Sequence, residues 1–126
     1  MLYTHVVLGT NDLTRAKKFY DALFSVMGGK ALGEAMPGKL LYEKDGQMFM
    51  IGKPIDGNPA SVANGFTLGF ALGSEDEVKA WHKAGIEHGG LDIENPPGIR
   101  KVGDAEYFFA YLRDPDGNKL CGRYDL

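Results

Sequence analysis

Residues 65–90, GFTLGFALGSEDEVKAWHKAGIEHGG, combine the pattern of a β-strand with that of an α-helix. Residues 66–72 alternate strictly between bulky apolar side chains and Gly, Thr or Ala, which is typical of a half-buried strand. Ser74 and Glu77 then form a capping-box pattern, and apolar residues recur at helical spacing up to the glycine pair 89–90. The stretch therefore predicts a strand followed by a helix.

The same pattern occurs earlier in the chain, in residues 3–28, YTHVVLGTNDLTRAKKFYDALFSVMG. Moving the sequence by 62 positions (65 − 3) places Asp12 on Ser74 as helix N-caps and Gly28 on Gly90 as helix ends. Short apolar segments with strand character follow each copy. Each half is therefore interpreted as a βαβββ module, and the chain as a tandem structural repeat.

Two Asp-Gly turns predict the hairpin of each module. Asp45-Gly46 and Asp116-Gly117 each lie between apolar segments, which is a strong hairpin signal. The turns lie 71 residues apart (117 − 46), which is 9 more than the offset of the helices (71 − 62). We therefore expect additional residues in the second half, around residues 95–103, next to the break Pro96-Pro97-Gly98.

Composition limits the possible classes of protein. The chain has 126 residues, 44% of them hydrophobic and 25% charged, so we expect one globular domain over residues 1–126. Its parts are a first module (about residues 1–54), a connection (about 55–64) and a second module (about 65–126). A net charge of −3 without a basic cluster argues against nucleic acid and membranes as partners. One cysteine cannot form an internal disulfide, and no signal-like segment opens the sequence, so we expect a cytoplasmic protein.

The alternation also predicts which side chains share a cleft. If the helices cover the convex side of the strands, the bulky residues of 66–72 face a helix and the small ones line a concave side. The two offsets then identify one concave position on each of four equivalent strands. We expect these four positions to converge: His5, Met50, Thr67 and Cys121.

Several motifs carry a resemblance to a known family. They are Thr4-His5-Val6-Val7-Leu8, Asn11-Asp12-Leu13, Phe19-Tyr20, Pro97-Gly98-Ile99-Arg100, and Tyr107 through Asp114-Pro115-Asp116-Gly117-Asn118-Lys119. Over nearly its whole length the chain resembles the glyoxalase I, bleomycin resistance and extradiol dioxygenase family, also called the vicinal oxygen chelate superfamily. The resemblance implies an α+β fold in which two tandem βαβββ modules curl into a concave half-barrel cleft, with the helices on the convex side.

The resemblance also implies a position for a metal ion. Metal-dependent members of that family place one ligand at each of the four equivalent strand positions, usually two His and two Glu or Gln, and the ion stabilises an enolate-type anion. Carried over to this sequence, the first His matches His5, but the other positions are Met50, Thr67 and Cys121. A thioether and a hydroxyl are poor ligands for a hard or borderline divalent ion. We therefore expect no metal site of the usual kind and no cofactor; the alternative is a site for Ni, Zn, Mn or Fe.

The residues leave more than one role open for the histidine and the cysteine. His5 is a candidate catalytic or ligand-binding residue, and equally a hydrogen-bonded structural histidine. Cys121 is its candidate catalytic partner, although a buried cysteine more often packs as a small apolar side chain. A soft-metal site formed by Cys121, Met50 and His5 is a further alternative.

Three cations are candidates for holding an anionic group. Arg100 lies in the expansion of the second half and could reach the mouth of the cleft, while Lys119 and Arg123 share a face with Cys121. With Met50 and Thr67 they complete the predicted ligand-binding set.

The sequence therefore predicts a protein of the glyoxalase and bleomycin resistance type that binds a small organic, anionic molecule without the usual metal. The alternative is a divalent-metal-dependent lyase or isomerase similar to lactoylglutathione lyase, or a dioxygenase. Whether the chain is an enzyme stays open at this point. We also expect a homodimer, because folds related to this one commonly pair through strand edges.

Overall fold

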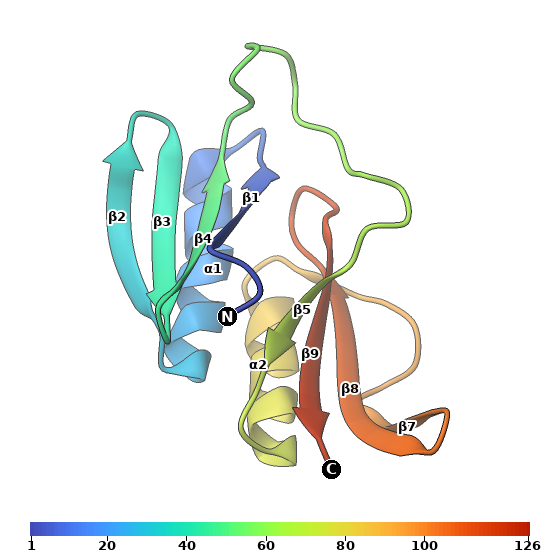
Figure 1. The fold of residues 1–126 in the computed structure, drawn as a ribbon. Helices are drawn as coiled ribbons and strands as arrows, with labels where there is room; N and C mark the ends of the chain where they lie inside the picture. Colours follow the sequence, from blue (N-terminus) through green and yellow to red (C-terminus); the bar gives the residue numbers. More distant parts are fainter.

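The computed structural model describes all residues, 1–126, as an α+β fold with two helices and nine strands in two sheets that do not close into a barrel (Figure 1). In chain order the elements are β1 (His5–Gly9), α1 (Leu13–Met27), β2 (Lys30–Met36), β3 (Lys39–Lys44), β4 (Gln47–Gly52), β5 (Leu68–Ala71), α2 (Glu75–Glu87), β6 (Leu91–Asp92), β7 (Gly98–Val102), β8 (Ala105–Arg113) and β9 (Lys119–Asp125). The order confirms two tandem βαβββ modules, with one additional strand in the second. Neither helix is long and apolar enough to cross a membrane.

The first module is a four-stranded sheet in the order β1-β4-β3-β2. Its helix α1 begins where the Asp12 carboxylate accepts a hydrogen bond from the backbone N–H of Arg15, and it ends at Gly28, whose φ of 74° is left-handed and favours glycine. β1 pairs with β4 in parallel, and the Cα atom of His5 lies opposite that of Met48. Both helix caps predicted from the sequence are therefore confirmed.

The second module repeats this plan in the order β5-β9-β8-β6, with β5 and β9 paired in parallel. Its helix α2 begins at Ser74, whose hydroxyl accepts from the backbone N–H of Glu77, as the capping-box pattern predicts. The strand expected over residues 66–72 is shorter, Leu68–Ala71, because the Phe66 N–H donates to the Ala63 carbonyl in a turn.

The outer strand of the second module differs from the prediction. The region around Pro96-Pro97-Gly98 was expected as a break, but residues 98–102 form β7, which pairs antiparallel with β8. β6 pairs with the far end of the same strand β8. Because proline cannot donate a ladder hydrogen bond, the two prolines divide this outer strand into two pieces.

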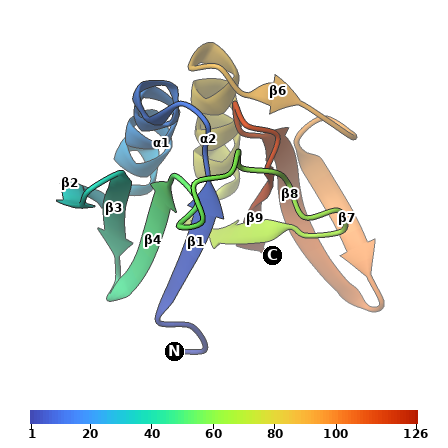
Figure 2. The ribbon, with the colours of Figure 1, turned by 90° about the horizontal axis from the view of Figure 1, so that it is seen from above.

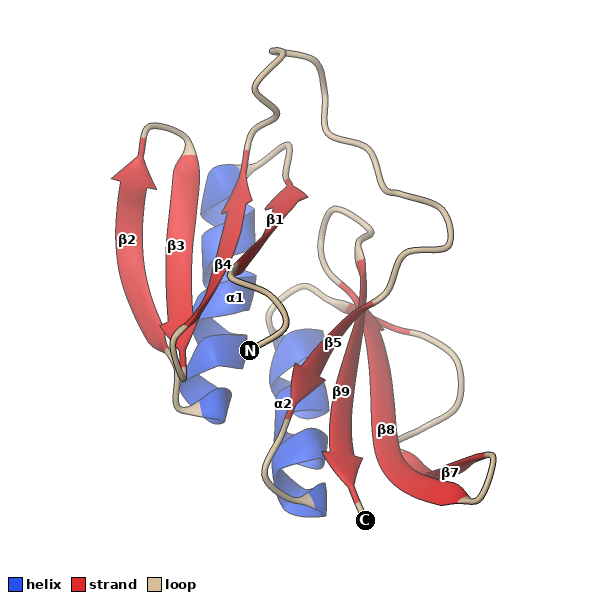
Figure 3. Cartoon of the chain, in the orientation of Figure 1, coloured by secondary structure: helices blue, strands red, loops and turns tan.

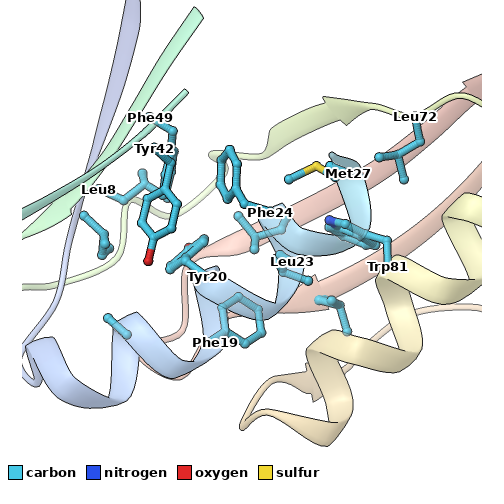
Figure 4. Packing of buried hydrophobic residues seen from close by; sticks show 14 of the residues in the cluster. Leu8, Phe19, Tyr20, Leu23, Phe24, Met27, Tyr42, Phe49, Leu72 and Trp81 are labelled. Carbon is cyan, nitrogen blue, oxygen red and sulfur yellow. The ribbon is translucent and has the colours of Figure 1, made fainter. Parts of the chain in front are cut away.

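The two modules share one hydrophobic core. Both helices lie on the same side of the sheets and pack against each other (Figures 2 and 3). Phe70 of β5 joins the modules: its ring centroid lies 5.9 Å from that of Phe24 and 6.0 Å from that of Phe49 in the first module, and 6.1 Å from that of Trp81 in the second. Figure 4 shows Phe24, Phe49 and Trp81 among the buried side chains. The packing therefore fixes β5 close to β1 and β4.

A polar network also joins the modules. The buried Asp114, in the turn between β8 and β9, accepts a hydrogen bond of 2.6 Å from the Tyr20 hydroxyl of α1. In the same turn, Asp116 accepts hydrogen bonds from the Thr10 hydroxyl and from the Arg15 guanidinium, at 2.5 and 2.9 Å. The hairpin turn predicted at residues 114–118 therefore also holds the start of α1 against the second module.

Candidate functional site

The two sheets face each other through two edge strands that do not pair. β1 is one edge strand of the first sheet, and β5 is an edge strand of the second. Between them lies a cavity of about 400 Å³, here named the inter-module cavity. The largely buried rings of Phe24, Phe49 and Phe70 form its floor, and the exposed His5 and Thr67 stand at its mouth. Its size and its apolar floor with few polar groups are typical of small-molecule sites.

A second cavity, of about 550 Å³, lies on the concave side of the second sheet and is named the concave cavity. Phe109, Cys121 and Arg123 line it. Four residues in β5 or directly before it are common to the lining of both cavities: Thr67, Gly69, Phe70 and Ala71. The two cavities are therefore neighbours across β5 and form one extended cleft region.

The four strand positions expected to converge are divided between these cavities. His5 lines the inter-module cavity, Cys121 lines the concave cavity, and Thr67 lines both. Met50 lines neither cavity, and its Cα neighbours are Val7 on β1 and Leu41 on β3. The structure therefore brings Thr67 together with His5 and with Cys121, but it does not bring Met50 into the same cavity.

His5 is exposed, at the start of β1. Its Nδ1 atom lies 2.9 Å from the Thr4 hydroxyl, so one ring nitrogen has a partner within the chain. If Nδ1 carries the proton and donates to Thr4, the lone pair of Nε2 stays available. The ring can thus offer one nitrogen to a group in the inter-module cavity.

Cys121 is buried in the middle of β9, with only 5% of its surface exposed. Burial raises the pKa of the Cys121 thiol to about 11, and the thiol donates a weak hydrogen bond to the Gly122 carbonyl at 3.7 Å. Near neutral pH the side chain is therefore a neutral thiol. Because the thiolate is the reactive form, this environment does not activate Cys121 as a nucleophile.

Two of the three candidate cations have carboxylate partners. The Lys119 ammonium lies 2.5 Å from the Glu94 carboxylate, and the Arg123 guanidinium lies 2.6 Å from the Asp125 carboxylate. Each also covers an aromatic ring, Lys119 that of Tyr111 and Arg123 that of Tyr107. Their positive charges are therefore largely compensated within the chain.

Arg100 differs from these two cations. It lies on β7 opposite Tyr107 of β8, so its side chain leaves the sheet on the concave face. The guanidinium donates hydrogen bonds to backbone carbonyls, of which the one to Pro96 is 2.8 Å long, and it forms no ion pair. Arg100 lines neither cavity but keeps its charge on the side of the sheet where the concave cavity lies.

Sequence reasoning missed several side chains of the cleft. Phe109 of the concave cavity lies between Tyr107 and Tyr111 in a ladder of tilted rings with centroids 5.6 and 5.9 Å apart. Met48 and Met27 line the inter-module cavity. Alternation along β8 would have identified Phe109, and alternation along residues 48–52 already places Met48 on the same face as Met50. Met27 enters from a helix, and no sequence signal indicated it.

The residues present do not fit a divalent metal of the kind implied for the fold. No group of three or more His, Cys, Asp or Glu side chains is close enough together to hold a metal ion. His5 and Cys121 line different cavities, and the remaining positions are a thioether and a hydroxyl. Hard and borderline divalent ions prefer carboxylate and imidazole ligands, and this set supplies one imidazole and no carboxylate.

Comparisons with known proteins agree with the fold. A family model described as the glyoxalase/bleomycin resistance protein/dioxygenase superfamily matches residues 3–121. A glyoxalase/bleomycin resistance protein from Albidiferax ferrireducens T118 is 44% identical, with a TM-score of 0.93 over 98% of this chain and 99% of that one. No curated protein matches the sequence.

More distant structures share the fold alone. A glyoxalase/bleomycin resistance protein/dioxygenase family enzyme from Burkholderia phytofirmans PsJN is 16% identical, with a TM-score of 0.74 over 98% of each chain. A lactoylglutathione lyase from Agrobacterium tumefaciens is 18% identical, with a TM-score of 0.64 over 97% of this chain and 92% of that one. With the family model covering 119 of 126 residues (121 − 3 + 1), the chain belongs to the glyoxalase/bleomycin resistance protein/dioxygenase superfamily.

Proposed function

We propose that this protein binds a small, largely apolar organic molecule in the inter-module cavity, without the divalent metal ion used by metal-dependent members of its superfamily. The observation that carries the proposal is the cavity itself. It holds about 400 Å³ between two unpaired strand edges, over a floor of aromatic rings and beneath the polar side chains of His5 and Thr67. Apolar burial then supplies affinity, and the few polar groups fix the orientation of the ligand.

The donor chemistry of the cleft supports binding without a divalent ion. The four strand positions carry His5, Met50, Thr67 and Cys121, so no carboxylate stands among them. Lewis-acid stabilisation of an enolate needs an ion held in a fixed position, and a carboxylate is the usual group for moving the proton. Neither is supplied by these side chains.

His5 is then a ligand-binding residue, and Cys121 forms part of an apolar wall. The two side chains line different cavities, and the raised pKa of the Cys121 thiol keeps it protonated. An acid–base and nucleophile pair needs its two atoms within hydrogen-bonding distance and an activated thiol. The proposal therefore gives neither residue a catalytic role.

The proposed charge of the ligand follows from the positions and partners of the three candidate cations. Lys119 and Arg123 are compensated by carboxylates, and Arg100, which has only backbone partners, lines neither cavity. None of the three predicted cations therefore offers a free charge to the inter-module cavity. We propose a molecule whose main body is apolar and which carries at most one acidic group. A homodimer and a cytoplasmic location stay predictions from the sequence.

The proposal can be tested with 8-anilinonaphthalene-1-sulfonate, an aromatic anion that fluoresces in apolar surroundings. Gly69 lines both cavities, and a Cβ atom built on it meets no other atom within 4 Å, so Gly69→Leu fills the cleft without strain in the backbone. We expect this variant to bind the probe about tenfold or more weakly. Ala80→Leu adds a similar side chain on the exposed face of α2 and should bind like the wild type.

Trp81 provides a second signal. It is the single tryptophan, it is fully buried, and it contacts Phe70 of the cleft floor. Probe binding should change its fluorescence in the wild type and in Ala80→Leu but not in Gly69→Leu. Equal probe binding by all three proteins would show that the cleft is not the site.

The lyase alternative has its own assay. The adduct of methylglyoxal and glutathione is offered to the protein with and without added Ni or Zn, and we expect no isomerisation because the strand positions lack a carboxylate. Metal-dependent turnover that is lost in His5→Ala would overturn the proposal.

A further inference from the structure

One imidazole and one thioether stand side by side at the mouth of the inter-module cavity. The parallel pairing of β1 with β4 sets the Cα atom of His5 opposite that of Met48, so both side chains leave the sheet on the same face. Both also line the inter-module cavity. Met48 is 39% exposed, and a third soft side chain, Met27, lines the same cavity. Figure 2 shows β1 and β4 as neighbours along their length.

One ring nitrogen of His5, Nδ1, has a hydrogen-bond partner within the chain. The Nδ1 atom of His5 lies 2.9 Å from the Thr4 hydroxyl, which can fix the tautomer in which Nε2 is free. A hydrogen bond of this kind orients the ring of a metal-binding histidine and raises the basicity of the other nitrogen. In His5 the Thr4 hydroxyl takes the place of the carboxylate or backbone carbonyl that commonly holds a ligating imidazole.

The ligands that hard ions require are missing around this pair. Asp45 is the only carboxylate lining the inter-module cavity; it is highly exposed and lies 3.4 Å from the Lys44 ammonium. Thioether sulfur is a poor ligand for Mg²⁺, Mn²⁺ or Zn²⁺, but it is among the ligands that select Cu(I). The pair of His5 and Met48 therefore suits a soft monovalent ion better than a hard divalent one.

We propose that the imidazole of His5 and the thioether of Met48 bind a soft monovalent metal ion of the Cu(I) class at the mouth of the inter-module cavity. The site does not depend on the binding of an organic molecule deeper in that cavity. It differs from a site at the four equivalent strand positions, because Met48 is not one of them and because Met50 and Cys121 do not line this cavity.

The chain contains matched controls for this pairing. Met36 on β2 is 46% exposed, but its Cα partner is Lys39. Met50 on β4 lies two residues from Met48 on the same face, but its Cα partners are Val7 and Leu41. Of the methionines on strands, only Met48 has an imidazole beside it, so only Met48 should respond as a ligand.

The first test uses Ag(I), which is soft, monovalent and redox-inert. The protein has five methionines, so labelling their methyl groups with ¹³C gives five signals to follow by NMR. We expect the Met48 methyl signal and the His5 ring signals to shift together up to about one equivalent of Ag(I), while the Met36 signal stays in place. Shifts at Met36 equal to those at Met48 would show unspecific thioether binding and overturn the proposal.

The second test measures affinity for Cu(I) by transfer from the coloured bicinchoninate complex under anaerobic conditions. Met48→Leu and His5→Ala should each bind about tenfold or more weakly than the wild type, whereas Met36→Leu and Met50→Leu should keep its affinity. Failure of the wild-type protein to remove Cu(I) from the complex refutes the site.

Cys121→Ser separates this site from the buried thiol. The thiol lies in the concave cavity and burial raises its pKa to about 11, so binding should persist in this variant. Loss of Cu(I) binding in Cys121→Ser would place the ion on the thiol and overturn the assignment. Because the Cu(I) transfer is measured without 8-anilinonaphthalene-1-sulfonate, its outcome stays distinct from the test of the organic ligand.

Discussion

Tyr20→Phe should destabilise the protein more than Tyr42→Phe, although each tyrosine hydroxyl donates a hydrogen bond of 2.6 Å to a carboxylate. The two acceptors differ in their access to water. Asp114, the partner of Tyr20, is 3% exposed, whereas the side chain of Asp21, the partner of Tyr42, is 37% exposed and also pairs with Lys17. Water can replace the lost hydroxyl only at Asp21.

The magnitude follows from what each substitution leaves behind. Both rings are fully buried and keep their packing as Phe, so the hydroxyl is the only group removed. A hydrogen bond to a charged group contributes about 1.5–3 kcal/mol. Asp114 keeps three donors, from Asn118 and Asp116, so we expect a loss of about 2 kcal/mol for Tyr20→Phe. For Tyr42→Phe we expect at most about 1 kcal/mol.

The loss of unfolding free energy in Tyr20→Phe should increase with pH. Burial raises the pKa of Asp114, and the hydrogen bond from Tyr20 opposes that rise. A carboxyl whose pKa is raised on folding contributes stability that is complete below its unfolded pKa and is lost as the pH rises through its folded pKa. Tyr20→Phe raises this pKa further, so its destabilisation should grow as the pH increases through the pKa of Asp114.

The assay is urea unfolding of the wild type and both variants, at about pH 7 and at a pH below the usual pKa of an aspartate. Near pH 7 we expect Tyr20→Phe to have the lowest unfolding midpoint, and at the acidic pH its deficit should shrink. A free-energy loss for Tyr42→Phe equal to that for Tyr20→Phe would refute the role given to burial of the acceptor. A deficit that is larger in acid would refute the sign of the linkage.

Two other properties can be tested directly. Gly122→Ala should lower the free energy of unfolding in urea by about 1–3 kcal/mol, because the added Cβ would lie 2.8 Å from the Trp81 ring and 3.0 Å from Leu72. The matched variant Gly69→Ala, whose Cβ would point into open space, should be close to neutral. Equal losses of free energy in the two variants would refute the packing argument. Cys121 should react with iodoacetamide at about pH 8 roughly 100-fold more slowly in the folded protein than in urea. The reason is that burial raises the pKa of the thiol from 9.0 to about 11, which lowers the fraction of thiolate. Similar rates in the folded and unfolded protein would show that the thiol is accessible and ionised.

The sequence predicted the elements whose ends are fixed by local chemistry. The N-cap at Asp12 and the glycine at Gly28 define α1, and Ser74 defines the start of α2, because each cap satisfies the backbone of its own first or last turn. The strand β7 was missed because it exists through pairing with β8, and a proline pair beside it resembles a loop. Pairing between distant segments leaves little local signal.

The candidate site was predicted less completely than the fold. Alternation predicted that His5, Thr67 and Cys121 face the cleft, because the direction of a side chain follows from its position in a strand, and each of the three lines a cavity. It could not show that Met50 lies outside both cavities, because alternation gives the face of a side chain and not the position of a cavity along that face. The partner of Arg123, two residues away at Asp125, was visible in the sequence, whereas the pairing of Lys119 with Glu94 depends on the folded loop.

The unpaired edges of β1 and β5, here called the seam, have a consequence for the molecules that the protein can admit. No ladder of backbone hydrogen bonds crosses the seam, and the contacts that bridge it near the cavity are those of Phe70 with Phe24 and Phe49. Widening the space between β1 and β5 breaks ring contacts, which a bound molecule can replace, and leaves every strand pair intact. A molecule that enters between these two strands therefore displaces ring contacts and breaks no backbone hydrogen bond of either sheet.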